Sequence, residues 1–236
     1  MAPNDIWLVH CDRAQIEAYS VTHNGSVLFD VDGTLIRERT VCEVIASRIG
    51  KSERMDWLEK HAGTPSTSVD LPSNQSVIDA REEMADWYIE AGREAVDTFL
   101  PHVTWAEGAH AGVKSLIDNG FLVAIASLTW SFGVERIAAD LGINELTATH
   151  LDWDSKQIAH QFAEDKAKYL QQMVAKYNIS SERVWAVGDS GGDAPMLKAA
   201  GRGVFVGDSD PEIPGVVHLP AGGIDAVAEL VLDAVG

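Results

Sequence analysis

Short runs of apolar, β-favouring residues recur along the chain, and turn residues bound them. The clear runs are Ser26–Val31, Leu122–Ser127, Arg183–Val187 and Gly203–Val206, and a weaker run is Leu146–Leu151. Each run is almost continuously apolar, which is typical of a strand in a parallel sheet that is covered on both faces. The pattern therefore predicts a buried, parallel sheet.

Between these runs, apolar residues recur at spacings of three and four, which indicates helices that pack one face against a core. The stretches are Ala109–Ile117, Phe132–Leu141, Phe162–Tyr177, Asp193–Ala200 and Ile224–Val235. Strands that alternate with helices in this way are typical of an α/β fold with right-handed crossovers. We predict a doubly wound, Rossmann-like parallel sheet.

One long stretch breaks the alternation. Residues 37–104 show helical periodicity and no strand signal apart from two short hinge strands at their ends, and Thr64–Ser76 is a polar loop rich in Pro and Ser. We predict a small helical cap domain over residues 37–104, inserted after the first predicted strand. The α/β core domain then comprises residues 1–36 and 105–236.

Composition narrows the class of protein. The chain has 236 residues, of which 46% are hydrophobic and 23% charged, as in an ordinary soluble globular protein. No apolar run reaches the roughly 18 residues of a membrane span, and the first 20 residues lack the order of a signal peptide, so we expect a cytoplasmic protein. A formal net charge of −18 disfavours nucleic acids and anionic membranes as partners. Cys11 and Cys42 stand far apart without a CxxC motif, so we expect neither a disulfide nor a zinc site.

Two carboxylates lie where the first predicted strand ends. Asp30 and Asp32 stand two residues apart in the segment Phe29–Leu35, and in an extended chain both side chains point to the same face. Ligands bind at the carboxyl ends of the strands in open parallel sheets, so this pair is placed for chemistry. On its own, however, the Asp-x-Asp-Gly pattern is equally compatible with an exposed turn.

Further polar residues stand near the ends of other predicted elements. Ser127 ends the second strong run, Asp189 and Asp193 follow the third within a glycine-rich turn, and Lys166 lies early in the helix before that strand. Taken singly, these residues are compatible with helix caps, a turn and a surface lysine. Their joint order along the chain favours one site.

This order, Asp-x-Asp, Ser, Lys and Gly-Asp-x-x-x-Asp, resembles that of the haloacid dehalogenase-like (HAD) hydrolase superfamily. The segments Glu164–Met173 and Val184–Gly207 are similar to its phosphoserine phosphatase-like branch. The resemblance covers about Val27–Ile36 and Ala106–Gly207, and it does not extend to the predicted cap.

The resemblance implies a phosphoaspartyl mechanism. Asp30 would attack the phosphorus, and Asp32 would protonate the leaving group and later deprotonate the attacking water. Ser127 and the adjacent Leu128 would contact the phosphoryl group, and Lys166 would pair with Asp30 and the phosphate.

The resemblance also implies a Mg²⁺ site. Asp30, the backbone carbonyl of Asp32 and Asp189 would hold the ion, with Asp193 as a ligand or as support for the other ligands. Charge favours this independently, since two carboxylates and a phosphate dianion at one site repel each other strongly unless cations offset them. Oxygen ligands suit Mg²⁺.

The chain departs from the branch in ways that bear on the substrate. Arg39 stands where phosphoserine phosphatases carry a substrate-binding Glu, Leu128-Thr129 replaces the usual Gly-Gly, and Gly192 replaces a common Asn. Four arginines of the predicted cap could bind a substrate carboxylate or a second phosphate if they face the cleft; they are Arg37, Arg39, Arg81 and Arg93. We expect Arg39 to do so and most of the others to be solvated.

We therefore predict a Mg²⁺-dependent phosphatase that acts on a small phosphorylated metabolite. One alternative is a phosphotransferase or phosphomutase of the same superfamily. Another is a non-catalytic protein that binds a phosphorylated metabolite. The sequence indicates neither the substrate nor the oligomeric state.

Overall fold

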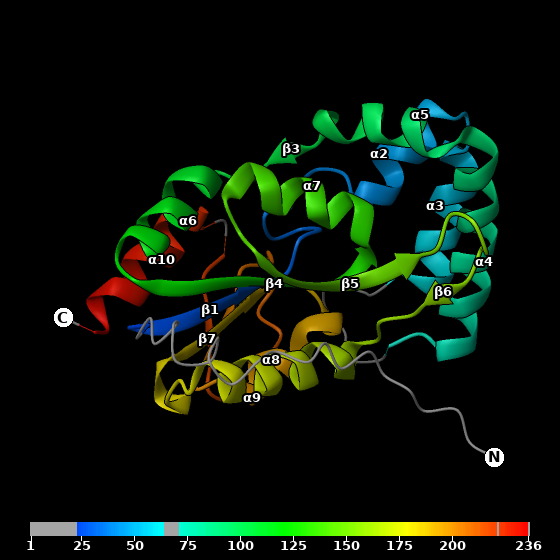
Figure 1. The fold of residues 1–236 in the computed structure, drawn as a ribbon. Coiled ribbons are helices and arrows are strands. Elements are labelled where there is room, and N and C mark those ends of the chain that lie inside the picture. The colour runs from blue at the N-terminus through cyan, green and yellow to red at the C-terminus, as the bar shows by residue number, and fades with distance from the viewer. Residues whose placement is uncertain (1–22, 64–70, 221, 236) are drawn as a thin grey trace, which may run out of the picture.

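The fold is built on one seven-stranded sheet. A computed structural model describes residues 23–63, 71–220 and 222–235 (Figure 1). The strands are β1 (Gly25–Phe29), β4 (Phe121–Trp130), β5 (Glu145–Leu151), β6 (Ile158–Ala159), β7 (Val184–Gly188), β8 (Arg202–Phe205) and β9 (Val216–His218). Their order across the sheet is β6-β5-β4-β1-β7-β8-β9, and all neighbours are parallel except β5 and β6.

Helices cover both faces of the sheet. They are α6 (Ala109–Asp118), α7 (Ser131–Leu141), α8 (Ala163–Tyr177), α9 (Ala194–Ala199) and α10 (Ile224–Asp233), with short 3₁₀ turns at Ser181–Arg183 and Gly191–Asp193. Figure 1 shows α6, α7 and α10 on one face and α8 and α9 on the other. The predicted doubly wound α/β fold is thereby confirmed.

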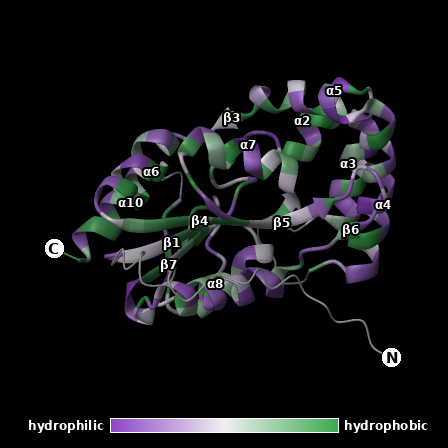
Figure 2. Cartoon of the chain, viewed as in Figure 1, coloured by the Kyte–Doolittle hydropathy of each residue, from purple (hydrophilic) through white to green (hydrophobic). Residues whose placement is uncertain are grey.

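The central strand β1 explains why both faces need cover. Its side chains alternate between two hydrophobic clusters: Val27 and Phe29 belong to the cluster under α6, α7 and α10, and Leu28 belongs to the cluster under α8 and α9. All three side chains are fully buried. Figure 2 shows green and white along the central strands, with purple and green mixed on the surrounding helices. The nearly continuous apolar run in the sequence is the consequence of this two-sided burial.

A helical insertion lies between two short paired strands. Strands β2 (Ile36–Arg37) and β3 (Thr104–Trp105) pair antiparallel, and the chain between them forms the insertion. Its helices are α2 (Val41–Arg48), α3 (Ser52–Ala62), α4 (Asn74–Ala91) and α5 (Arg93–Phe99), followed by a 3₁₀ turn at Leu100–His102. Figure 1 shows α3 and α4 side by side beyond the carboxyl end of β5.

Some details differ from the sequence-based expectation. Strands β6 and β9 were not predicted, because β6 has two residues and β9 follows a segment rich in Pro and Gly. Helix α4 begins at Asn74, inside the predicted polar loop Thr64–Ser76, since the Ser73 hydroxyl accepts a hydrogen bond from the Ser76 backbone N–H at 3.2 Å and caps the helix.

Some of the sequence-based predictions concern residues that lie outside the described chain. This holds for Cys11 and for the first 22 residues of the predicted core domain. No helix of the described chain has the length and apolar character that crossing a membrane requires.

Candidate active site

The register of the three central strands brings the polar strand ends together. Phe29 in β1 lies level with Ile125 in β4 and with Val187 in β7. Asp30 follows directly after Phe29, while Ser127 and Asp189 each come two residues after the level positions. The three side chains therefore emerge at one edge of the sheet, as a site at the carboxyl ends of parallel strands requires.

Asp30 is held where β1 ends. Its backbone N–H donates to the carbonyl of Val187 at 2.9 Å, and the residue is only 5% exposed. The chain then turns through Gly33, which has a φ of +83°. A Cβ at Gly33 would lie 2.1 Å from Oδ2 of Asp189, so the close approach of the two loops requires glycine there.

Lys166 joins two of the carboxylates. Its Nζ donates to Oδ1 of Asp30 and to Oδ1 of Asp193, at 2.6 Å each, and the side chain is only 2% exposed. The other carboxylate oxygen of Asp193 accepts hydrogen bonds from the backbone N–H groups of Asp189 and Ser190 and from the Ser190 hydroxyl. Asp193 thereby fixes both the lysine and the turn that carries Asp189.

The carboxylates also form a candidate metal centre. One ligand oxygen from each of Asp30, Asp189 and Asp193 lies within 4.8 Å of the others. When all three are ionised, Lys166 offsets only one of their charges, so the group retains an excess of negative charge that a divalent cation would balance. Both oxygens of Asp193 are engaged within the protein, which makes Asp30 and Asp189 the better donors. All the available ligands are oxygens, as Mg²⁺ prefers.

The pKa values of this group reflect first its burial and then its charges. Burial raises the pKa of Asp189 to about 8, and the charges of Asp193 and Asp30 act in the same direction. Burial and Asp193 also raise the pKa of Asp30, because together they outweigh the opposing effect of Lys166. Burial disfavours the charged form of Lys166, but its two acidic partners prevail and raise the pKa above the usual value of a lysine.

Asp32 has a different environment from Asp30. Its Oδ1 accepts a hydrogen bond from the Val41 backbone N–H at 2.8 Å, at the first residue of α2. Burial, followed by the charge of Asp30, raises the pKa of Asp32 to about 7. A carboxyl group with that pKa can both donate and accept a proton near neutral pH, as a general acid and base must.

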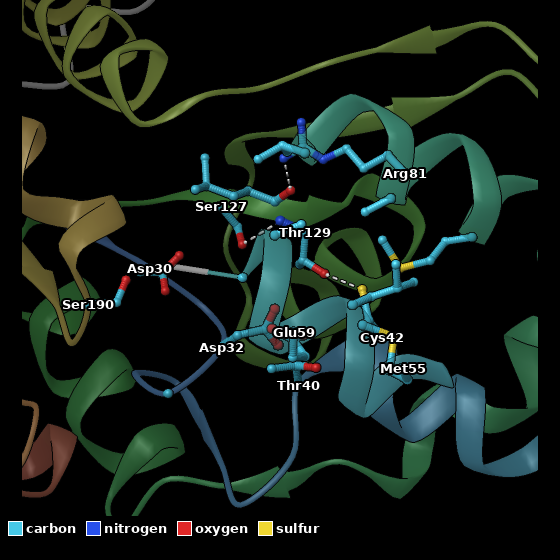
Figure 3. A pocket seen from close by; sticks show the side chains of 18 of the residues that line it. Asp30, Asp32, Thr40, Cys42, Met55, Glu59, Arg81, Ser127, Thr129 and Ser190 are labelled. Atoms are coloured by element: carbon cyan, nitrogen blue, oxygen red, sulfur yellow. Dashed lines mark hydrogen bonds between the residues drawn. The ribbon is translucent and has the colours of Figure 1, made fainter. Parts of the chain in front are cut away.

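These residues line one pocket of about 260 Å³ (Figure 3). The sheet side of its lining includes Asp30, Asp32, Ser127, Leu128, Thr129, Lys166, Asp189 and Ser190. The side formed by the helical insertion comprises Thr40, Cys42, Met55, Leu58, Glu59, Ala62, Gly63, Val77, Ala80, Arg81 and Met84. The pocket is thus polar where the strands end and mostly apolar on the insertion.

The structure brings most of the predicted site residues together. Asp193 contacts Lys166 rather than appearing in the pocket lining, and Ser127, 2% exposed, accepts a hydrogen bond from the Thr129 backbone N–H at 3.3 Å. Arg39 does not join them: it is exposed, it lies in the turn between β2 and α2, and it is absent from the pocket lining.

Two charged residues of the insertion lie in the pocket although the sequence did not favour them. Glu59 lines it, and burial raises its pKa to about 7. Arg81 also lines it and is only 5% exposed, so it is an exception to the expectation that most of these arginines are solvated. Their spacing from apolar residues could have identified them. Glu59 stands four residues after Met55 and Arg81 three before Met84, so each lies on the buried face of its helix.

The sequence of the chain matches one known family and several known proteins. The family model of haloacid dehalogenase-like hydrolases matches residues 27–198. A phosphoserine phosphatase of Methanocaldococcus jannaschii is 28% identical over 181 residues, which cover 74% of this chain and 82% of that protein. One of Archaeoglobus fulgidus is 25% identical over 75% of this chain, which spans about half (51%) of that relative's length.

Solved structures share the fold. A phosphoserine phosphatase with a phospho-aspartyl intermediate analogue has a TM-score of 0.71 at 22% identity, over 89% of this chain and 99% of that one. A HAD family hydrolase from Salmonella enterica serovar Typhi has a TM-score of 0.76 at 21% identity, over 89% of this chain and 72% of that one. The chain belongs to the haloacid dehalogenase-like hydrolase family, and the relatives that it resembles include phosphoserine phosphatases.

Proposed function

We propose that the protein is a Mg²⁺-dependent phosphatase that hydrolyses a small phosphorylated metabolite through a phosphoaspartyl intermediate on Asp30. The observation that carries this proposal is the arrangement around Asp30: a buried carboxylate bound by Lys166, beside Asp32, at the polar end of a pocket. The relatives named phosphoserine phosphatase support the same reaction type.

The proposed reaction has two steps. A carboxylate oxygen of Asp30 forms a bond to phosphorus while the bond to the leaving oxygen breaks, and the carboxyl group of Asp32 gives its proton to that oxygen. Asp32 then takes a proton from water, which attacks the phosphorus and breaks the bond to Asp30. The pKa of about 7 allows Asp32 to serve in both steps.

The other residues would position the phosphoryl group and balance the negative charge around it. Ser127 and the Leu128 backbone would contact the phosphoryl oxygens, and Lys166 would offset the charge of Asp30 and of the phosphate. Asp30, Asp189 and the carbonyl of Asp32 would hold Mg²⁺, supported by Asp193, and the bound ion would neutralise charge on the phosphoryl group. We propose that the helical insertion acts as a cap that shields the pocket from bulk water.

Phosphate release tests this function directly. The protein is incubated with Mg²⁺ and a panel of sugar phosphates, phosphorylated acids and O-phosphoserine, and free phosphate is measured with and without EDTA. We expect EDTA-sensitive release from some members without any acceptor sugar. Release only with an acceptor would indicate a phosphotransferase. Tight binding without release across the panel would indicate a binding protein.

The proposed metal site can be tested by protein stability, without measuring turnover. We expect Mg²⁺ at ten times its dissociation constant to stabilise the fold by about 1.4 kcal/mol at pH 8 and to raise the Tm by roughly 3–5 °C. The gain should be much smaller at pH 5.5, where Asp189, with a pKa of about 8, carries a proton in the metal-free protein. Thermal melts with Mg²⁺ and with EDTA at both pH values measure this.

The sign of the pH effect follows from linkage. A raised carboxyl pKa in the folded state means that the metal-free protein binds a proton that the unfolded chain lacks, so its stability falls as pH rises towards 8. Mg²⁺ reverses that loss. The variant D189N should lose most of the Mg²⁺ effect, whereas D208N, which changes an exposed aspartate, should keep it. An equal Mg²⁺ shift in D189N would contradict the assignment.

A further inference from the structure

The backbone around Ser127 forms where the ladder between β4 and β5 is interrupted. Ala126 in β4 lies level with Thr147 in β5, and the next level pair is Trp130 with Thr149. Three residues of β4 therefore lie opposite a single residue of β5. Extra residues of this kind take backbone groups out of the regular ladder and redirect the side chains beside them. The backbone groups of this loop thus need other partners.

Two side chains supply partners for the carbonyl of Leu128. The Thr149 hydroxyl donates to it at 2.9 Å, and Nη2 of Arg81 donates to it at 2.7 Å. Thr149 is fully buried, and its hydroxyl oxygen also accepts a hydrogen bond from the Gln161 backbone N–H at 3.3 Å. The hydroxyl of Thr149 therefore uses its hydrogen on the loop and is itself held in place.

One peptide group connects this carbonyl to Ser127. The peptide bonds of the loop are trans, and in a trans peptide the C=O and the following N–H point in opposite directions. The Thr129 N–H therefore points away from Thr149, and it donates to Oγ of Ser127 at 3.3 Å (Figure 3). Holding the Leu128 carbonyl thus holds the N–H group that Ser127 accepts.

This hydrogen bond leaves the Ser127 hydroxyl available to a ligand. A serine hydroxyl has one hydrogen to donate and two sites that accept. The Thr129 N–H occupies one of the accepting sites, and no described residue accepts the hydrogen. Because Ser127 and Asp30 both line the pocket, that hydrogen can be donated to a phosphoryl oxygen.

The sequence explains why this loop needs side-chain donors. Leu128-Thr129 stands where the phosphoserine phosphatase-like branch usually has Gly-Gly, and neither residue has a positive φ. The conformation of the loop is thus one that ordinary residues adopt, and tertiary contacts must select it among the others open to such residues. The hydrogen bonds to the Leu128 carbonyl are such contacts.

We propose that Thr149 is a positioning residue of the active site. Through the Leu128 carbonyl, its hydroxyl orients the peptide between Leu128 and Thr129, so that Ser127 donates its hydroxyl hydrogen to the phosphoryl group. This inference rests on the proposed phosphatase function and deepens it. Thr149 is absent from the pocket lining, so it acts through the loop and not by touching the substrate. Its removal therefore leaves the pocket wall unchanged, which makes it a clean probe of the loop.

The variant T149V removes the hydroxyl and keeps the shape of the side chain. We expect kcat/KM for phosphate release to fall about tenfold, as the loss of a buried hydrogen bond predicts, and T149S, which retains the hydroxyl, to keep most of the wild-type value. The dissociation constant of inorganic phosphate, measured by calorimetry with Mg²⁺, should rise by a similar factor in T149V. The control T147V changes a threonine two residues earlier in the same strand, outside the pocket lining, and should leave both values unchanged.

A double-mutant cycle with Ser127 separates positioning from a general contribution to stability. If Thr149 acts through Ser127, T149V should lower kcat/KM about tenfold when Ser127 is present and by no more than about twofold in the S127A background. Equal losses in the two backgrounds would overturn the inference, because Thr149 would then support the fold without acting through Ser127. An unchanged kcat/KM in T149V would overturn it as well.

Thermal melts show whether each variant is folded at the assay temperature. If T149V is not, the comparison of T149S with T149A replaces it in the same cycle, and equal kcat/KM values in those two variants would overturn the inference. If the wild-type protein releases phosphate from no member of the panel, the proposed function fails instead. The dissociation constants of inorganic phosphate in the wild type and T149V then still test the role of Thr149, and equal values would overturn it.

Discussion

Replacing Asp30 with Asn is expected to lower kcat for phosphate release by about four orders of magnitude or more, because the amide cannot form the bond to phosphorus. The change is isosteric. It also removes one of several buried carboxylates, and Lys166 keeps its hydrogen bond to Asp193 in the variant. We therefore expect D30N to fold, and its thermal melt in EDTA measures this. The rate is measured as phosphate release on the best substrate of the panel.

A chemical trap distinguishes the nucleophile from a residue that only binds metal. Brief reaction with substrate followed by borohydride converts an aspartyl phosphate to homoserine, and mass spectrometry of the peptide that contains residue 30 reads the product. We expect the reduced residue in the wild-type protein and in D208N, where an exposed aspartate is changed, but not in D30N. Labelling at another aspartate, or turnover in D30N near that of the wild type, would contradict the proposed mechanism.

The sequence predicted the sheet well because its central strands are buried on both faces. The runs that became β1, β4 and β7 are almost purely apolar, and two-sided burial in a parallel sheet imposes that pattern whatever the substrate. The placement of Asp30, Ser127 and Asp189 then follows from position, since they stand where those strands end. The three residues of strand β9 are all at least partly exposed, so the hydrophobic pattern there was too weak to predict a strand.

The insertion was harder to read because its role depends on which way its side chains face. Among the arginines of the insertion the sequence favoured Arg39 for the site, yet Arg39 lies exposed in a turn and Arg81 lies buried on α4. Arg39 was favoured because it stands where phosphoserine phosphatases carry a substrate-binding Glu, but it is absent from the pocket lining. The helical spacing of Arg81 with Met84 indicates its burial, because residues three apart lie on the same face of a helix and both are buried on α4.

Replacing Lys166 with Met is expected to produce the largest loss of stability. The ammonium group is 2% exposed and bridges two carboxylates that are themselves buried, and its removal leaves Asp30 and Asp193 facing each other without a cation. Breaking a buried ion pair by removing one partner costs about 3–5 kcal/mol, a large part of the total stability of a domain. Denaturant unfolding at pH 8 in EDTA measures this, with Mg²⁺ excluded because it could replace the ammonium.

The pH dependence identifies the cause of that loss. Burial and the charge of Asp193 raise the pKa of Asp30, and the charge of Lys166 opposes them. Without the ammonium this pKa rises further, so the folded variant binds a proton that the unfolded chain does not. The difference in the free energy of unfolding between the wild type and the variant should therefore shrink as pH falls from 8 to 5.5. Lys166 itself cannot produce this change, because its pKa is raised above the usual value of a lysine and it stays charged throughout that range.

Two further variants separate charge from packing. The double variant K166M/D193N removes one of the opposed carboxylates and should recover much of the stability at pH 8, since a single buried carboxyl group remains opposite the methionine. K168M removes an exposed lysine of the same helix and should unfold like the wild type. K166M could instead lose the same free energy of unfolding at both pH values, without relief by D193N. That result would show that Lys166 stabilises the fold by packing. The buried Asp30–Lys166–Asp193 arrangement would then owe its stability to shape rather than to charge.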